Sequence, residues 1–274
     1  MTHTTLKVSA IQMVSSEDVE SNLAKSIGLM EKAIERSAAR LLVLPENVLC
    51  FGAKPSGALN DRITVAVERY REFSREQGVV LVAGSVPLAV RPDGSALSDR
   101  YRSASLVFSN GRLVARYDKL HMFDVDVADG HGQYRESNTF EAGQDVVVSD
   151  LGDFHLGLSI CYDLRFPELF QDLRSRGAEV IALPSAFTRV TGEAHWEVLV
   201  RARAIETQCF VVAANQGGAH SLKRETWGQS MIVDPWGRIL AQCERGEDFC
   251  SAELDFESLD NVRSKIPVMS HRRY

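Results

Sequence analysis

The chain has 274 residues, of which 45% are hydrophobic and 25% are charged, and its formal net charge is −6. These values are ordinary for one globular domain over residues 1–274, and a chain of this length needs neither disulfides nor metal ions to stabilise its core. The acidic balance argues against nucleic acid as a partner, and no apolar run approaches the roughly 20 residues of a membrane span.

Five cysteines lie at positions 50, 161, 209, 243 and 250, without a CxxC pair or the spacing of a zinc site. This pattern indicates free thiols in a reducing compartment. The N-terminal run MTHTTLKVSAIQMV lacks a charged segment followed by a long apolar core, so it is expected to be a strand rather than a signal peptide. We therefore expect a cytoplasmic protein.

Strands and helices alternate along the first half of the chain. The spacing of apolar residues predicts a strand at 6–13, a helix at 19–37 after possible caps at Ser15 and Ser16, a strand at 40–44, a helix at 63–77, and strands at 79–84, 101–109 and 112–119. The last two flank Asn110-Gly111, a strong signal for a β-hairpin.

The second half begins with a segment rich in Asp, Gly and His at 122–143, whose length is typical of a functional loop. The pattern then predicts a strand at 154–160, helices at 165–175 and 193–208, and strands at 180–183, 209–214, 230–233 and 238–242. Such alternation, interrupted by hairpins, favours a layered α/β fold with a mixed sheet over a parallel barrel.

Three residues with chemical potential each follow a predicted strand: Glu46, Lys119 and Cys161. The carboxyl ends of neighbouring strands converge on a ligand crevice, so the three side chains could meet if their strands are neighbours. Cys161 stands between a strand and a predicted helix, where the helix dipole would lower the pKa of its thiol. The alternatives are an inert buried cysteine, a surface glutamate and a solvated lysine.

Other polar residues allow two interpretations each. Arg165 could bind a substrate carboxylate with its planar guanidinium, or it could pair with Glu168. His195 could contact a substrate, or it could serve at a helix end or an interface. Glu136 lies in the long loop, where an exposed charge is the ordinary case.

The segments LVLPE, YDKLH and ICYDLRFPEL occur in this order and resemble the Glu, Lys and Cys motifs of the nitrilase superfamily, the carbon–nitrogen hydrolases. The resemblance extends from the first predicted strand to the C-terminus. It implies an α/β fold built as a four-layer α-β-β-α sandwich, and a homodimer. It also implies that Glu46, Lys119 and Cys161 are catalytic, and Glu136 in YRES matches a further glutamate of the family.

Details near Cys161 indicate a branch within this superfamily. Nitrilases proper tend to carry Cys-Trp-Glu, whereas this chain has Cys161-Tyr162-Asp163 and resembles the nitrilase-like amidases. The segments DVDVADGHGQYRES and IPVMSHRR are similar to the type that acts on deaminated glutathione. Residues 51–61 depart from the pattern of that type.

The resemblance implies a cysteine amidase that cleaves a small carboxylate-bearing amide to an acid and ammonia through a thioester, with no metal and no cofactor. Tyr162, Arg165 and His195 are the expected substrate contacts, with the backbone N–H of Tyr162 as an oxyanion donor. The alternatives are an ω-amidase acting on α-ketoglutaramate, an enzyme for another amide or carbamoyl substrate, a redox-sensing thiol protein and a non-catalytic scaffold.

Overall fold

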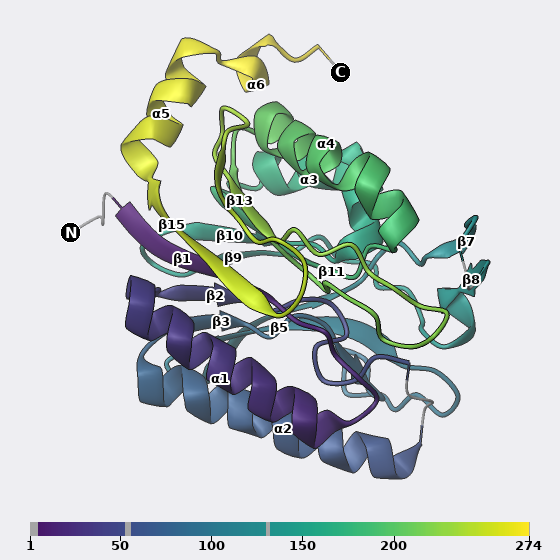
Figure 1. The fold of residues 1–274 in the computed structure, drawn as a ribbon. Coiled ribbons are helices and arrows are strands. Elements are labelled where there is room, and N and C mark those ends of the chain that lie inside the picture. Colours follow the sequence, from purple (N-terminus) through teal and green to yellow (C-terminus); the bar gives the residue numbers. More distant parts are fainter. Residues whose placement is uncertain (1–4, 53–55, 130–131, 274) are drawn as a thin grey trace.

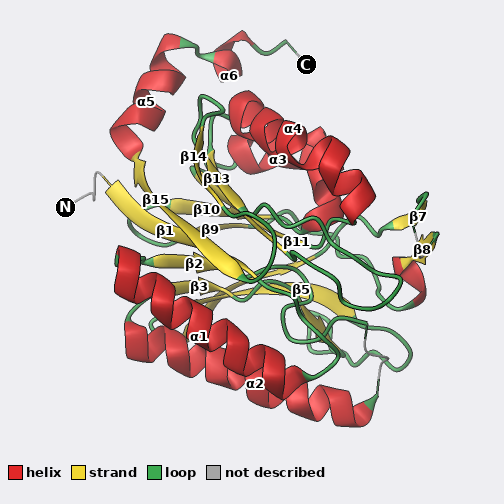
Figure 2. Ribbon diagram, viewed as in Figure 1, coloured by secondary structure: helices red, strands yellow, loops and turns green. Residues whose placement is uncertain are grey.

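The computed structural model describes residues 5–52, 56–129 and 132–273. Two β-sheets lie face to face, and a pair of helices covers the outer side of each sheet (Figures 1 and 2). The layers therefore run α-β-β-α, which confirms the expected sandwich. Within the described ranges, no helix combines the length and apolar character needed to cross a membrane.

The first sheet has seven strands in the order β15-β1-β2-β3-β5-β4, with β6 paired to β5. The bounds are β1 (Thr5–Gln12), β2 (Leu41–Val43), β3 (Val80–Val82), β4 (Val86–Leu88), β5 (Arg102–Ser109), β6 (Arg112–Asp118) and β15 (Asp248–Asp255). Strands β1, β2 and β3 are parallel and the other pairs are antiparallel.

The second sheet has six strands in the order β14-β13-β12-β11-β10-β9, of which β10, β11 and β12 are parallel. The bounds are β9 (Val148–Asp150), β10 (His155–Leu158), β11 (Val180–Ser185), β12 (Phe210–Asn215), β13 (Met231–Val233) and β14 (Ile239–Gln242). Each of these two sheets is therefore mixed. The alternation of strands and helices had predicted one mixed sheet.

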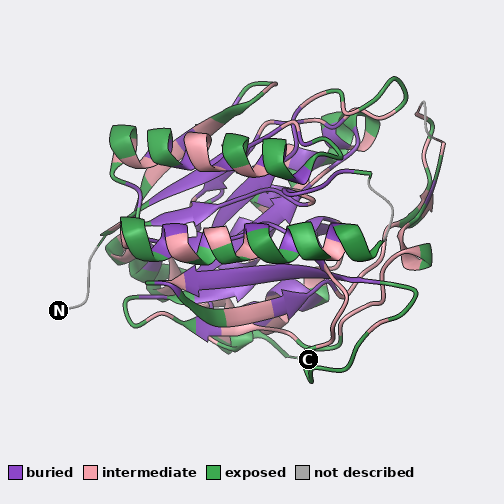
Figure 3. Cartoon of the chain, turned by 90° about the horizontal axis from the view of Figure 1, so that it is seen from below, coloured by how far each residue is buried: buried purple, intermediate pink, exposed green. Residues whose placement is uncertain are grey.

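Helices α1 (Val19–Ser37) and α2 (Gly57–Gln77) cover the first sheet, and α3 (Pro167–Ser175) and α4 (Arg189–Thr207) cover the second (Figure 1). The short helices α5 (Phe256–Lys265) and α6 (Val268–His271) follow β15. Figure 3 shows that the outward faces of the helices are exposed, while the strands beneath them are buried. One apolar stripe per helix is enough to cover a sheet.

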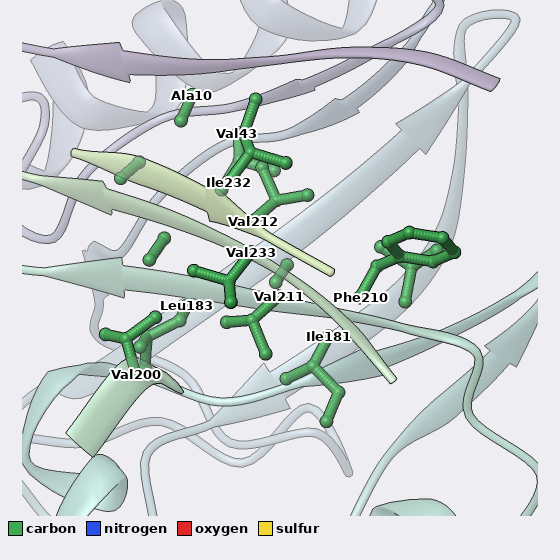
Figure 4. Close-up of a cluster of buried hydrophobic side chains, with 14 of the residues drawn as sticks. Ala10, Val43, Ile181, Leu183, Val200, Phe210, Val211, Val212, Ile232 and Val233 are labelled. Atoms are coloured by element: carbon green, nitrogen blue, oxygen red, sulfur yellow. The ribbon is translucent and has the colours of Figure 1, made fainter. Parts of the chain in front are cut away.

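The core lies mainly between the two sheets. Ala10 and Val43 of the first sheet pack in the same cluster as Val212 and Ile232 of the second (Figure 4). All six residues of β11 and of β12 are buried, since both faces of these strands are covered. Such strands appear as continuous apolar runs, and each large apolar side chain contributes about 1.5–3 kcal/mol by its burial.

Helix α1 has the predicted bounds, but the carboxylate of Asp18 caps it rather than Ser15 or Ser16. Two other helices begin elsewhere than predicted, for local reasons. Helix α2 begins at Gly57, six residues before the prediction, because the Ser56 hydroxyl caps it. Helix α3 begins only at Pro167, which suits the first helical position but leaves the preceding residues in a 3₁₀ turn.

The predicted hairpin at Asn110-Gly111 is confirmed as β5–β6, with both turn residues at positive φ. The predicted loop at 122–143 contains a small hairpin of β7 (Asp124–Asp126) and β8 (Gln133–Arg135), followed by a 3₁₀ turn at Glu136–Asn138. Residues 130–131 of this loop, and residues 53–55 of the segment that departs from the family pattern, lie outside the described residues. Strands β4, β9 and β15 and helices α5 and α6 were not predicted.

Candidate active site

Glu46, Lys119 and Cys161 meet at one end of the sandwich and line a shared cavity of about 320 Å³. Glu46 follows β2 and Lys119 follows β6, both in the first sheet, whereas Cys161 follows β10 in the second. The sequence analysis required these strands to be neighbours in one sheet, and they are not. The packing of two sheets brings the three side chains together.

The backbone around Glu46 is fixed by contacts with both sheets. Gly84, at φ +58°, packs so closely that a Cβ atom there would lie 2.0 Å from the carbonyl oxygen of Pro45. The side-chain amide of Gln216, at the end of β12, donates to the carbonyl of Glu46 at 3.0 Å. Only glycine tolerates this approach at position 84, which explains how the turn holds the Glu46 carboxylate at the cavity.

Lys119 is the centre of a buried charge cluster. Its ammonium donates to Glu46 Oε1 at 2.7 Å and to both oxygens of Glu136 at 2.9 Å, although the residue is only 2% exposed. Burial opposes the charge, but Glu136, Glu46 and Cys161 outweigh it and raise the pKa of Lys119 well above its ordinary value. The ammonium is thus a fixed cation, held by two carboxylates in a site from which water is largely excluded.

Glu136 lies in the 3₁₀ turn after β8, and the structure brings it to the site. Its carboxylate also accepts from the backbone N–H of Phe123 at 2.6 Å, which holds the long loop against the cavity. Burial, opposed by Lys119 and supported by Glu46, raises the pKa of Glu136. The bland interpretation of Glu136 as an exposed loop charge is therefore wrong.

Cys161 has a left-handed backbone, at φ 47°, which is costly for a non-glycine residue and common at functional sites. Its sulfur accepts a long hydrogen bond of 3.5 Å from the backbone N–H of Ala186. The pKa of the thiol is raised well above its usual value, first by burial and then by Glu46, against the opposing effect of Lys119. The expected lowering by a helix dipole is wrong, because only a 3₁₀ turn follows Cys161.

A buried carboxylate that the sequence analysis did not single out, Asp163, supports this turn. Asp163 accepts from Tyr117 Oη at 2.6 Å, from the N–H of Ile160 at 2.8 Å and from the N–H of His121 at 3.2 Å, and it pairs with His121 Nδ1 at 2.7 Å. These contacts connect the end of β6, which carries Lys119, to the turn that carries Cys161. The sequence signal that could have identified Asp163 is an acidic residue two positions after Cys161, close to the apolar strand that precedes the cysteine.

Of the three expected substrate contacts, two line the cavity. Tyr162 and Arg165 are cavity residues, whereas His195 is exposed on α4 and is not among them. The Arg165 guanidinium lies over the rings of Tyr162 and Phe187, 5.9 and 5.3 Å from their centres. His195 Nδ1 lies 3.2 Å from Arg165 Nη1, so it contacts the arginine rather than the cavity.

The alternative partner of Arg165, Glu168, is not used: none of the ion pairs between described residues includes Arg165. Further cavity residues come from segments that carried no motif and include Phe123, Phe187, Thr191 and Arg224. Tyr134, of the YRES segment, also lines the cavity. Within the described ranges, no three His, Cys, Asp or Glu side chains converge as metal ligands.

A thiol, a carboxylate and a fixed ammonium around one cavity are the groups that acyl transfer needs. The carboxylate can move the thiol proton, the sulfur can attack a carbonyl carbon, and the ammonium can stabilise the oxyanion that forms.

Comparison with known proteins agrees with this chemistry. Residues 7–264 match the carbon–nitrogen hydrolase family. The chain is 43% identical over 273 residues to the deaminated glutathione amidase of Yersinia enterocolitica, covering 97% of this chain and 93% of that protein. It is 39% identical over 272 residues to the human protein of the same name, covering 97% and 82%.

Solved structures give the same likeness. The crystal structure of the Caenorhabditis elegans NitFhit protein superposes with a TM-score of 0.89 at 39% identity, covering all of this chain and 66% of that one. Nit3 of Saccharomyces cerevisiae, a member of branch 10 of the nitrilase superfamily, superposes with a TM-score of 0.84 at 28% identity, covering 99% and 97%.

Proposed function

The chain belongs to the carbon–nitrogen hydrolase family and is an amidase, and from this premise we propose that it hydrolyses deaminated glutathione with Cys161 as nucleophile. The observation that carries the proposal is the ammonium of Lys119, buried between Glu46 and Glu136 beside the thiol. Burying charged groups costs free energy, and such clusters are typical of functional sites. A scaffold protein would have no use for one.

In the first step, Glu46 takes the proton from Cys161 while the sulfur bonds to the amide carbon and the carbonyl π electrons move to oxygen. Because the pKa of the resting thiol is raised, the proton leaves as the attack occurs and no free thiolate accumulates. Lys119 and the N–H of Tyr162 stabilise the oxyanion. The oxyanion then collapses, the C–N bond breaks, and protonated Glu46 gives its proton to the leaving amine.

In the second step, Glu46 takes a proton from water, and the hydroxide attacks the thioester carbon. Collapse of this second oxyanion breaks the C–S bond, and Glu46 returns the proton to the sulfur. Glu136 takes no part in proton transfer; its two oxygens hold Lys119 in place. Preorganised charge of this kind provides most of the rate enhancement in many enzymes, and one oxyanion donor contributes about 10²–10³ in rate.

The identity of the leaving group corrects the expectation of ammonia. In deaminated glutathione the scissile amide joins an α-keto acid to the amine of cysteinylglycine. Hydrolysis therefore yields α-ketoglutarate and the dipeptide, whereas α-ketoglutaramate would release ammonia. Arg165, which lines the cavity four residues after the nucleophile, is our choice for the α-keto carboxylate common to both compounds.

We further propose that residues 1–274 form one catalytic domain, that the protein acts as a cytoplasmic homodimer, and that it uses no cofactor. The family match over 7–264 supports the single domain. The five free and buried cysteines support a reducing compartment.

The test is turnover of deaminated glutathione, α-ketoglutaramate, glutamine and a carbamoyl amino acid by the wild type and by Cys161→Ala. α-Ketoglutarate and cysteinylglycine are measured for the first substrate, and ammonia for the others. We expect preference for deaminated glutathione and no turnover by the variant. A preference for α-ketoglutaramate would instead favour an ω-amidase, the second candidate, which the same cavity could serve.

A further inference from the structure

Among the described residues, three arginines line the cavity, and two of them form no ion pair with a described carboxylate. Arg135 pairs with Asp126 at 3.0 Å. By contrast, no ion pair within residues 5–52, 56–129 and 132–273 includes Arg165 or Arg224. A guanidinium is always charged and strongly favours a carboxylate or phosphate, so an unpaired one in a cavity is a candidate anion contact.

Arg224 stacks on two aromatic rings, and its side chain forms no hydrogen bond with another described residue. Its guanidinium lies 4.3 Å from the ring centre of Phe51 and 5.6 Å from that of Tyr134. The ring of His220 stacks on Phe51 at 3.7 Å with an interplanar angle of 12°. Two groups this close to one ring centre must occupy opposite faces, so Phe51 is sandwiched between His220 and Arg224.

His220 suits this arrangement because it is neutral. Its Nδ1 lies 2.7 Å from the carbonyl of Ser15 and its Nε2 lies 2.8 Å from the Thr226 hydroxyl. Burial, together with the charge of Arg224, lowers the pKa of His220 to about 4. The stack therefore carries one positive charge, and the edge of that guanidinium is left to bind an anion. A stacked arginine loses less side-chain entropy when it binds.

The two guanidiniums pack against different parts of the cavity wall. Arg165 is in the turn of Cys161, and its neighbour Phe187 directly follows Ala186, whose N–H contacts the sulfur. Arg224 instead rests on Phe51, in the segment that follows Glu46, and on Tyr134, just before Glu136. In the proposed mechanism, Glu46 protonates the leaving amine, so the leaving group must lie on the side of the carboxylates.

We propose that Arg224 binds the carboxylate of the leaving amine, and that Arg165 and Arg224 together select an amide with a carboxylate at each end. The inference rests on the proposed function and refines it. In deaminated glutathione, the α-keto carboxylate would face Arg165 and the glycine carboxylate Arg224. α-Ketoglutaramate leaves ammonia and offers nothing to Arg224, so the arginine would distinguish the two substrates.

The experiment compares kcat/KM for deaminated glutathione, its analogue with the glycine carboxylate converted to an amide, and α-ketoglutaramate. Each is measured with the wild type, Arg224→Gln and Lys223→Gln. Lys223 is exposed on the same loop and does not line the cavity, so its variant removes the same charge nearby. Thermal unfolding of the three proteins checks that the loop change has not altered the fold.

We expect Arg224→Gln to lower kcat/KM for deaminated glutathione, relative to α-ketoglutaramate, by about 10- to 100-fold, the range of a charged hydrogen bond. For the wild type, kcat/KM on the amidated analogue should be lower than on deaminated glutathione by a similar factor. For Arg224→Gln, the same change of substrate should lower kcat/KM only a little. This non-additivity identifies direct contact between the side chain and the carboxylate. Lys223→Gln should match the wild type on all three.

Two failures can be told apart. If the wild type hydrolyses deaminated glutathione but Arg224→Gln loses the same factor on all three substrates, the proposed function stands and the role of Arg224 is overturned. If the wild type hydrolyses α-ketoglutaramate or another amide but not deaminated glutathione, the proposed substrate and the second carboxylate contact both fall.

Discussion

Removal of the Asp163 carboxylate should damage both stability and catalysis. Asp163 is fully buried and receives four donors, from the Tyr117 hydroxyl, two backbone N–H groups and the His121 ring. Removing one partner of a buried charged network typically costs about 3–5 kcal/mol, because the remaining donors are left unsatisfied. We expect this loss in the free energy of unfolding of Asp163→Ala.

Asp163→Asn refines the magnitude. The amide has the shape of the carboxylate but only one acceptor oxygen, and its NH₂ group must face either the N–H of Ile160 or that of His121. The Tyr117 hydroxyl and the His121 ring can change donor role, but a backbone N–H cannot. One orphaned N–H and the lost charge give an expected loss of about 2–3 kcal/mol. Displacement of Cys161 relative to Lys119 should also lower kcat by about 100-fold.

The assay is urea unfolding together with kcat and KM on the best amide substrate. Asp145→Asn serves as the control, since Asp145 is exposed and its change should stay within about 0.5 kcal/mol. If Asp163→Asn matched this control in unfolding and in kcat, the network would be unimportant and the reasoning would be refuted.

Three other predictions test the site and its supports. Glu136→Gln should lower kcat by about 10- to 100-fold with little change in KM, since Lys119 loses a charged anchor; an unchanged kcat would remove Glu136 from the site. Gly84→Ala should lower the free energy of unfolding by about 2 kcal/mol or more, and should lower kcat, because the added Cβ atom clashes with Pro45. The control is Gly78→Ala, also at positive φ but with nothing within 4 Å of the added Cβ, which should lose only about 1 kcal/mol and keep its kcat. Equal effects of the two substitutions would contradict the clash. His220→Gln tests the lowered pKa of about 4, which means that the folded state resists protonation of His220. The free energy of unfolding of the wild type should therefore be at its full value above pH 6.5 and should fall between pH 6.5 and 4 by about 2–3 kcal/mol more than that of the variant. Parallel curves of unfolding free energy against pH for the two proteins would contradict this.

Much of the fold follows from local pattern. The strands β11 and β12 are apolar runs, the helix at 19–37 has one apolar stripe, and Asn110-Gly111 sets a hairpin. The missing elements have non-local causes. β15 pairs with β1 along the whole length of both strands, about 240 residues apart in sequence, and its own residues alternate too irregularly to indicate a strand. The start of α3 depended on a 3₁₀ turn whose cause is the tertiary contact of Asp163.

The sequence by itself indicated the class of chemistry, because the motifs around Glu46, Lys119 and Cys161 resemble those of the carbon–nitrogen hydrolases in this order. Only the tertiary structure decided how these groups behave. Packing of one sheet on the other brings Cys161 to Glu46 and Lys119, and the resulting burial raises the pKa of the thiol that a local helix dipole was expected to lower. The placement of Arg165 and Arg224 on the cavity wall, and of His195 outside it, was decided in the same way. Hydrophobic periodicity is a property of neighbouring residues, whereas burial and the Coulomb field sum over groups that only the folded chain brings together.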